Sequence, residues 1–170
     1  MNKINIQFYK TKYGEFILGS FDNRLCLLDF RYRKMRTTVD NRIKKGLDAE
    51  YIESDTEVLK KTRQQMQEYF NMQRKEFDIP LLTVGTDFQK SVWNALLEVP
   101  YGRTSTYLDL AKKINNEKAV RAVASANGAN SIGLIIPCHR IIGSNGELVG
   151  YGGGLPIKKR LLKLEQNIFV

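Results

Sequence analysis

The stretch "TSTYLDLAKKINNEKAVRAVASANGA" (residues 104–129) decides the fold of the second half of the chain. Its composition predicts two short helices, over 104–114 and 117–129, with the polar pair Asn115-Asn116 breaking the chain between them and Gly128 closing the second helix. Two short helices joined by a tight break predict a helix-turn-helix. The second helix is rich in small side chains, so it can lie close to whatever it binds.

The flanking sequence extends this prediction. Upstream, "FQKSVWNALL" (88–97) places apolar residues at helical spacing. Downstream, Asn145-Gly146 between apolar runs predicts a hairpin over 140–150, which would be the wing of a winged helix-turn-helix. Pro156 opens a last helix.

The first half has a different character, which places a domain boundary near residue 85. We expect a strand over 4–9, a hairpin over 15–30, a charged irregular segment over 31–50, and a short strand over 77–84 interrupted by Pro80. Ser54 and Glu57 have the spacing of a capping box that opens a helix. The prediction is an α+β chain with domains over 1–84 and 85–170.

Composition limits the classes of function. The 170 residues are 42% hydrophobic and 26% charged. The net charge of +9, spread over both halves, fits nucleic acid as a partner and solubility through charge equally well. No apolar run could span a membrane and the N-terminus lacks a signal sequence, so we expect a cytoplasmic protein. We also expect it to be a monomer. Two cysteines and one histidine cannot complete a structural zinc site, so no metal or cofactor is expected.

One dipeptide carries chemistry: Cys138 precedes His139, the only histidine in the chain. A thiol with a pKa near 8.5 becomes nucleophilic when an adjacent base or positive field favours the thiolate, and His139 and Arg140 could supply both. Neighbours in an extended segment point to opposite faces, so direct contact needs a turn, which Pro137 permits, or a bridging water. The other cysteine, Cys26, has the setting of a buried apolar residue.

Glu165 is a candidate third member. It lies four residues after Leu161, on or beside the apolar face of the last helix. A carboxylate aimed at the core needs a partner, and His139 is the natural one. The alternative is a solvated glutamate near the C-terminus.

Several motifs in order resemble one family. "FQKSVWNALLEVPYGRTSTY", "KAVRAVASANGAN", "IPCHRII", "GYGGG" and "KKRLLKLE" resemble the methylated-DNA–protein-cysteine methyltransferases, which remove O6-alkyl groups from guanine in DNA. The resemblance covers residues 85–170, whereas the first part of the chain agrees only in size and rough content. It implies a ribonuclease-H-like α/β domain followed by a winged helix-turn-helix domain.

The resemblance also implies roles for residues. Cys138 would accept the alkyl group, His139 would act as its base through a water, and Glu165 would hold His139. Asn130 would tie the helix-turn-helix to the active site, and Tyr107 would help rotate the nucleotide and donate a proton to the departing guanine. The base pocket would be formed by Tyr151, Gly152, Gly153 and Lys158.

The partner implied is double-stranded DNA that contains O6-alkylguanine. Arg121 would enter the duplex and fill the space of the flipped base, because a buried base edge cannot be attacked inside the stack. The DNA-binding set comprises Tyr107, Ala119, Arg121, Ala122, Asn127 and Gly128. The thioether product has no activated carbonyl, so each chain would act once. Activity on O4-alkylthymine stays open.

The sequence departs from the family pattern at two positions: Ser131 stands where many members have proline, and Gly152 stands where some have a hydroxyl residue. Two other functions compete. A DNA-binding regulator would leave Cys138 and His139 unexplained. A Cys-His acyl-transfer enzyme or hydrolase would need an oxyanion hole and would give the helix-turn-helix no role.

Overall fold

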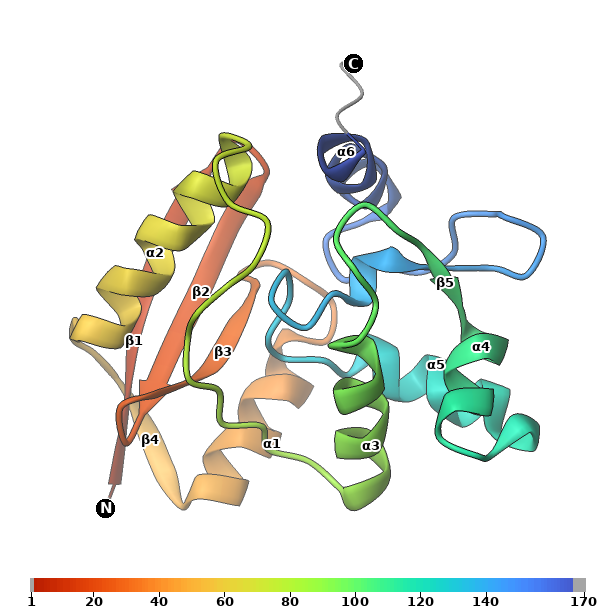
Figure 1. The fold of residues 1–170 in the computed structure, drawn as a ribbon. Helices are drawn as coiled ribbons and strands as arrows, with labels where there is room; N and C mark the ends of the chain where they lie inside the picture. Colours follow the sequence, from red (N-terminus) through yellow and green to blue (C-terminus); the bar gives the residue numbers. More distant parts are fainter. Residues whose placement is uncertain (1, 167–170) are drawn as a thin grey trace. The chain divides into compact units, whose positions relative to one another are not determined.

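The computed structural model describes residues 2–166 of the chain, which divides into two compact units, Met1–Gly85 and Thr86–Val170. Figure 1 shows the elements of each unit. The first is a mixed sheet with two helices, and the second is mainly helical, so the chain is α+β. Among residues 2–166, the structure contains no helix long and apolar enough to cross a membrane.

The first unit is built on a four-stranded sheet with the order β3-β2-β1-β4. Its strands are β1 (Asn2–Thr11), β2 (Gly14–Phe21), β3 (Arg24–Phe30) and β4 (Ala49–Glu53). The predicted hairpin is confirmed: β2 and β3 pair antiparallel, and the two residues of the turn, Asp22 and Asn23, both have positive φ. Such a turn matches the twist of the paired strands.

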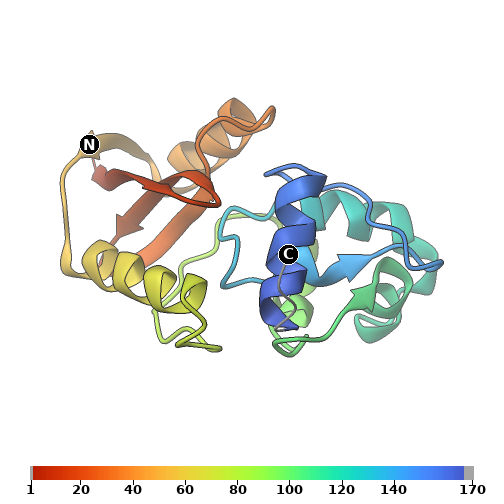
Figure 2. The ribbon, with the colours of Figure 1, turned by 90° about the horizontal axis from the view of Figure 1, so that it is seen from above.

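Two helices cover opposite faces of this sheet, α1 (Arg36–Leu47) and α2 (Glu57–Phe70), as both views show (Figures 1 and 2). The α1 face buries Val39 and Ile43 among apolar residues of the strands. On the other face, Phe70 of α2 stacks on Tyr13 with the ring centroids 4.6 Å apart. The sheet is therefore buried on both sides.

Three predictions for this unit need correction. The segment 31–50 is mostly ordered as α1 and the start of β4, which pairs parallel to β1. The side chain that caps α2 belongs to Thr56, which accepts from the amide of Leu59, and not to Ser54. Within 77–84, Leu81 forms only an isolated bridge with Leu25.

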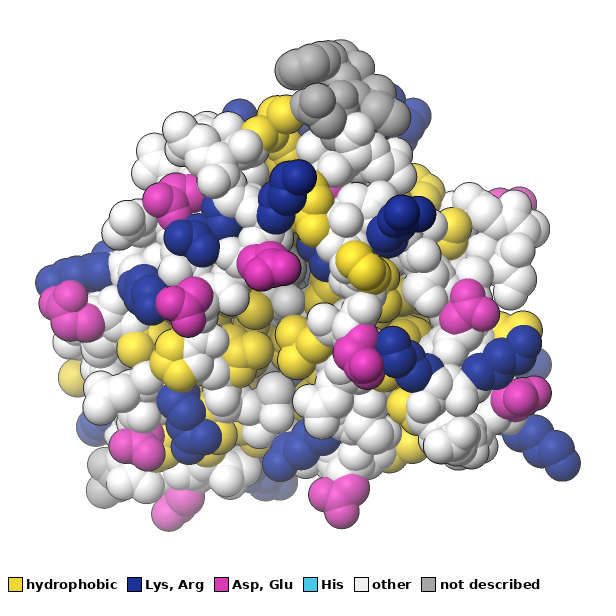
Figure 3. All heavy atoms as spheres, viewed as in Figure 1, with side chains coloured by type: hydrophobic (Ala, Val, Ile, Leu, Met, Phe, Trp, Pro, Cys, Tyr) yellow, Lys and Arg dark blue, Asp and Glu magenta, His cyan; other side chains and the backbone are white. Residues whose placement is uncertain are grey.

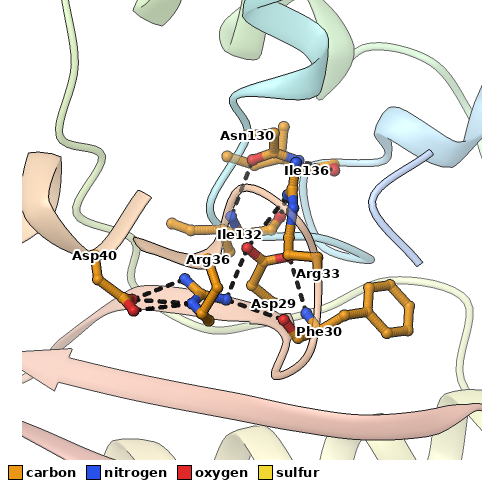
Figure 4. Close-up of polar contacts among 8 residues, drawn as sticks. All are labelled: Asp29, Phe30, Arg33, Arg36, Asp40, Asn130, Ile132 and Ile136. Carbon is orange, nitrogen blue, oxygen red and sulfur yellow. Dashed lines mark hydrogen bonds and ion pairs between the residues drawn. The ribbon is translucent and has the colours of Figure 1, made fainter. Parts of the chain in front are cut away.

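A buried ion-pair cluster joins the end of β3 to α1 (Figure 4). The carboxylate of Asp29 accepts from Arg33 and Arg36, and Arg36 also pairs with Asp40. Burial raises the pKa of Asp29, while the two arginines and the amide of Phe30 lower it. The cluster explains why a charge-rich segment folds onto the sheet.

In the second unit, three helices pack on one another: α3 (Asp87–Leu96), α4 (Tyr107–Lys113) and α5 (Val120–Gly128), the last preceded by the 3-10 turn η1 (Glu117–Ala119). The predicted helix-turn-helix corresponds to α4 and α5. The indole of Trp93 donates to the carbonyl of Ala126 over 2.9 Å, which fixes α3 against α5. Gly128 is the last residue of α5 and has no positive φ, so it does not end the helix in the expected way.

The remaining elements are β5 (Ser105–Thr106), the 3-10 turn η2 (Cys138–Arg140), β6 (Ile141–Ile142) and α6 (Leu155–Glu165). The expected hairpin over 140–150 is wrong, because β6 pairs parallel with β5. Gly143 and Glu147 instead close a turn around Asn145-Gly146, and residues 143–154 contain no strand. The predicted start of the last helix is confirmed, since Pro156 lies in the first turn of α6.

Candidate active site

A tight turn places Cys138 and its neighbours. The amide of Cys138 donates to the carbonyl of Ile136, and Pro137 at the centre has φ −81° and ψ 63°. This is an inverse γ-turn, and η2 follows it directly. The backbone therefore makes the turn that the Cys138-His139 pair requires. Cys138 is half-buried, whereas the His139 side chain is buried.

The last helix supplies the partner of His139. Nε2 of His139 lies 2.6 Å from Oε2 of Glu165, and both side chains are at most 1% exposed. Since an ionised carboxylate can only accept, the histidine nitrogen must be the donor. Helix α6 packs on η2, and Figure 2 shows it crossing this part of the unit.

Arg140 also points at Glu165 rather than at the thiol. Its Nε donates to Oε1 over 2.7 Å, its Nη2 donates to Oε2 over 3.0 Å, and its Nη1 donates to the carbonyl of Val99. Burial alone would raise the pKa of Glu165, but the hydrogen bonds and charges of His139 and Arg140 lower it to about 2. The carboxylate is therefore ionised at neutral pH.

His139 is neutral at neutral pH. Burial lowers its pKa, and the charges of Arg140 and Lys158 lower it further, against the opposing effect of Glu165. In a neutral imidazole whose Nε2 carries the proton, Nδ1 holds the lone pair. Nδ1 is buried and has no hydrogen-bond partner among residues 2–166. The ring therefore presents a proton acceptor.

Asn130 fixes the segment that leads to Cys138 (Figure 4). Its buried amide donates to the carbonyl of Ile136 over 2.9 Å and to that of Ile132 over 3.4 Å, while its Oδ1 accepts from the amide of Ile132.

A strained turn lies inside the same loop. Leu134 has φ 65°, and the amide of Ile135 donates to the carbonyl of Gly133 across it. A γ-turn with positive φ is rare and strained.

Two side chains converge on the loop before α6. The Tyr107 hydroxyl donates to the carbonyl of Val149 over 3.2 Å, and Nζ of Lys158 donates to the same carbonyl over 2.9 Å and to that of Gly150 over 3.2 Å. Lys158 is fully buried, and burial lowers its pKa to about 8 against the opposing charge of Cys138. Burial, and then Cys138, raise the pKa of Tyr107. Both side chains therefore lie near the thiol.

The loop residues expected around the base lie beside this cluster. The rings of Tyr151 and His139 have centroids 6.5 Å apart in an edge-on arrangement. Gly152 and Gly153 are half-buried and lead into Gly154, whose φ of 91° favours glycine at the start of α6.

The expected DNA-binding residues are divided by burial. Arg121, Ala122 and Gly128 are exposed and Ala119 is half-buried, whereas Asn127 is only 6% exposed. Asn127 therefore lies on the inner side of α5, away from the surface that Arg121 occupies. On the face shown in Figure 3, cationic and anionic side chains are interspersed rather than gathered by sign.

Within residues 2–166 the structure brings together no group of three histidine, cysteine or acidic side chains that could hold a metal ion.

Comparison with known proteins identifies the family. Residues 4–83 match the ribonuclease-like domain of 6-O-methylguanine DNA methyltransferase, and residues 87–167 match its DNA-binding domain. A methylated-DNA–protein-cysteine methyltransferase from Methanosarcina acetivorans is 43% identical over 92% of this chain and 95% of its own. The chain belongs to the 6-O-methylguanine DNA methyltransferase family.

Solved structures of this methyltransferase family agree with the fold. The crystal structure of Mycobacterium tuberculosis OGT in complex with DNA superposes with a TM-score of 0.82 at 36% identity, over 96% of this chain and 93% of that one. An O6-methylguanine DNA methyltransferase from Methanococcus jannaschii superposes with a TM-score of 0.63 at 27% identity, over 96% of this chain and 95% of that one.

Sequence reasoning about this methyltransferase missed two features of the site. Arg140 was expected to act on the thiol, but it binds Glu165. Its position next to His139 is the only sign of this contact in the sequence. The strained turn at Leu134 had no signal, because leucine does not mark positive φ.

Proposed function

We propose that this protein repairs DNA by direct reversal, transferring the alkyl group of O6-alkylguanine to Sγ of Cys138. The Sγ–carbon bond forms as the carbon–O6 bond breaks, and guanine leaves. The Cys138 proton passes to Nδ1 of His139 through a water, and Tyr107 donates a proton to the departing base. The reaction needs no cofactor.

The observation that carries this proposal is the buried 2.6 Å contact between Nε2 of His139 and Oε2 of Glu165, next to Cys138 in the chain. With Glu165 ionised, this contact assigns the ring proton to Nε2 and leaves the lone pair on Nδ1, which has no partner among residues 2–166. A thiol of ordinary pKa needs such a base to become a thiolate at neutral pH. In this arrangement Cys138 is the nucleophile, His139 the base, and Glu165 and Asn130 position them.

The same contacts support the proposed base pocket and DNA surface. Lys158 donates to the carbonyls of Val149 and Gly150, which supports a role for the loop that continues into Tyr151, Gly152 and Gly153 as one wall of the pocket. A base inside a duplex is out of reach of Cys138 and must be flipped. Arg121 is exposed on α5 and can fill the resulting space, and the small side chains of Ala119 and Ala122 with Gly128 let the helix approach the duplex.

The product sets the number of turnovers. A thioether offers water no activated carbonyl, so each chain reacts once. We propose that the protein acts as a monomer in the cytoplasm on duplex DNA, with O6-alkylguanine as substrate.

Incubation with duplex DNA that carries O6-methylguanine tests the proposal. Mass spectrometry should find one added methyl group on the peptide that contains Cys138. The peptide that contains Cys26 is an internal control, because burial raises the pKa of that thiol to about 12. An unmodified Cys138 peptide would overturn the proposal, and lesion clearance by Cys138→Ala would overturn the nucleophile.

A further inference from the structure

Arg140 is a buried cation with an unusually complete set of contacts. Its side chain is 8% exposed. Three of its nitrogens donate, two to Glu165 and one to the carbonyl of Val99, and its guanidinium lies 5.7 Å from the centroid of the Tyr101 ring. An arginine keeps its charge at any pH at which the protein is folded. A fixed positive charge therefore sits beside Glu165.

The carboxylate of Glu165 is saturated by its donors. Oε1 accepts from Nε of Arg140 and from the amide of Gly102, and Oε2 accepts from His139 and from Nη2 of Arg140. A carboxylate offers about four acceptor sites, so all of them are used. His139 thus faces a carboxylate whose charge Arg140 already balances.

We propose that Arg140 is a positioning residue that sets the pH at which His139 can accept the Cys138 proton, by balancing the charge of Glu165. This inference rests on the proposed function. Without Arg140, Glu165 would attract a proton to His139 more strongly. The imidazole would then stay protonated to a higher pH, and its lone pair would be missing near neutrality.

The other groups that face His139 do not perform this task. From α6, Glu165 and Lys158 act on the ring, and from its own turn Arg140 does; Cys138 precedes His139 in the same turn and acts on Lys158. Tyr151 faces it edge-on. Lys158 is cationic too, but it donates to Val149 and Gly150 rather than to Glu165. Among residues 2–166, Arg140 is the cation paired with Glu165.

The test compares Arg140→Gln, which removes the charge, with Arg140→Lys, which keeps it. Arg160→Gln is the matched control, since Arg160 is exposed on the same helix as Glu165. The rate of Cys138 alkylation by O6-benzylguanine is measured by mass spectrometry across a range of pH. We expect the acid limb of the Arg140→Gln profile to move up by about one pH unit, as loss of a nearby charge produces. Arg140→Lys should be alkylated more slowly, but the acid limb of its pH profile should move little. Arg160→Gln should match the wild type. A rate lowered equally at every pH would mean a merely structural role and would overturn the inference.

A second measurement serves for a variant that is alkylated too slowly for its pH profile to be recorded. His139 is the only histidine of the chain, so the nitrogen NMR signals of its ring need no assignment. In the wild type they should report a neutral ring with the proton on Nε2. The protonation midpoint should rise by about one pH unit in Arg140→Gln, and an unchanged midpoint would overturn the inference. If wild-type Cys138 is not alkylated, the proposed function fails, while the midpoint still decides the role of Arg140.

Discussion

Nε2 of His139 lies 2.6 Å from Oε2 of Glu165, and Arg140 donates to both oxygens of the same carboxylate. A single carboxylate therefore orients the base and balances a buried cation. Because the three residues depend on one another, a change to Glu165 should affect both the chemistry and the stability of the second unit.

Glu165→Gln should lower both the alkylation rate and the free energy of unfolding. A glutamine amide that accepts from Arg140 turns its NH2 group toward His139, which forces the ring proton onto Nδ1 and removes the lone pair. Loss of a general base costs about 10²–10⁴-fold in rate. Arg140 is left without its counter-ion, which costs about 3–5 kcal/mol when the pair is buried. Single-turnover kinetics and urea unfolding measure the two effects. Glu98→Gln, a change at an exposed ion pair, should alter neither, and equal effects of both variants would contradict the assignment.

The depressed pKa of Glu165 predicts how stability depends on pH. The carboxyl has a pKa of about 2 in the folded protein, against about 4.3 in an unfolded chain. Its contribution is full above the unfolded value and is lost as pH falls from about 4.3 through about 2. Urea unfolding at neutral pH and in acid should show that the free energy of unfolding falls more for the wild type than for Glu165→Gln. Parallel losses would mean that another group governs acid unfolding.

The helix-turn-helix was predictable, because it rests on local signals, whereas the residues alone left Glu165 as either the partner of His139 or a solvated side chain, and only the family resemblance favoured the pairing. Helical spacing and the break at Asn115-Asn116 place α4 and α5. The strand pair β2 and β3 was predictable for the same reason, since its turn chemistry is contained in two residues.

The elements that were not predicted from the sequence depend on pairing with residues outside the element itself. The buried face of α1 consists of Val39 and Ile43 alone. The helix therefore also depends on the ion pairs of Asp29, which lies before it in the chain. Asn145-Gly146 does form a turn, but β6 finds its partner in β5, far away in sequence. Neither partner can be read from the residues next to the element.

Lys158→Met should separate stability from activity. Lys158 is buried with a pKa of about 8, below its value of about 10.4 in an unfolded chain. Folding therefore disfavours its charge, and wild-type stability should rise between about pH 8 and pH 10.4, because the unfolded chain binds more protons there. The variant should lack this rise and keep its stability at neutral pH. Loss of hydrogen bonds from a charged donor, about 1.5–3 kcal/mol, should slow alkylation by O6-benzylguanine about 10-fold or more. Lys159→Met, at the exposed neighbouring position, is the control, and an equally slow control would contradict a role in holding the loop.

Arg121→Ala should impair repair of duplex DNA more than reaction with a free base. Arg121 is exposed on α5 and does not belong to the cluster around Cys138. Base flipping costs a few kcal/mol, part of which an inserted side chain offsets. We expect a loss of about 10-fold with O6-methylguanine in duplex DNA, which is 1.4 kcal/mol, and an unchanged rate with O6-benzylguanine. Lys90→Ala removes an exposed cation from α3 and should reduce duplex repair less. Equal losses on both substrates would argue against insertion into the duplex.

The positive φ at Leu134 predicts an inverted order of stability for two substitutions. Leu134 is buried, and either alanine or glycine there leaves the same kind of cavity. A side chain at φ 65° costs roughly 1–2 kcal/mol that glycine does not incur. Leu134→Gly should therefore be more stable than Leu134→Ala by about 1 kcal/mol in urea unfolding. At Leu161, inside α6, the order should be the ordinary one, with glycine less stable than alanine by about 1 kcal/mol. The same order at both positions would mean that the turn before Cys138 relaxes when the leucine side chain is removed, and that the positive φ at residue 134 stores no strain.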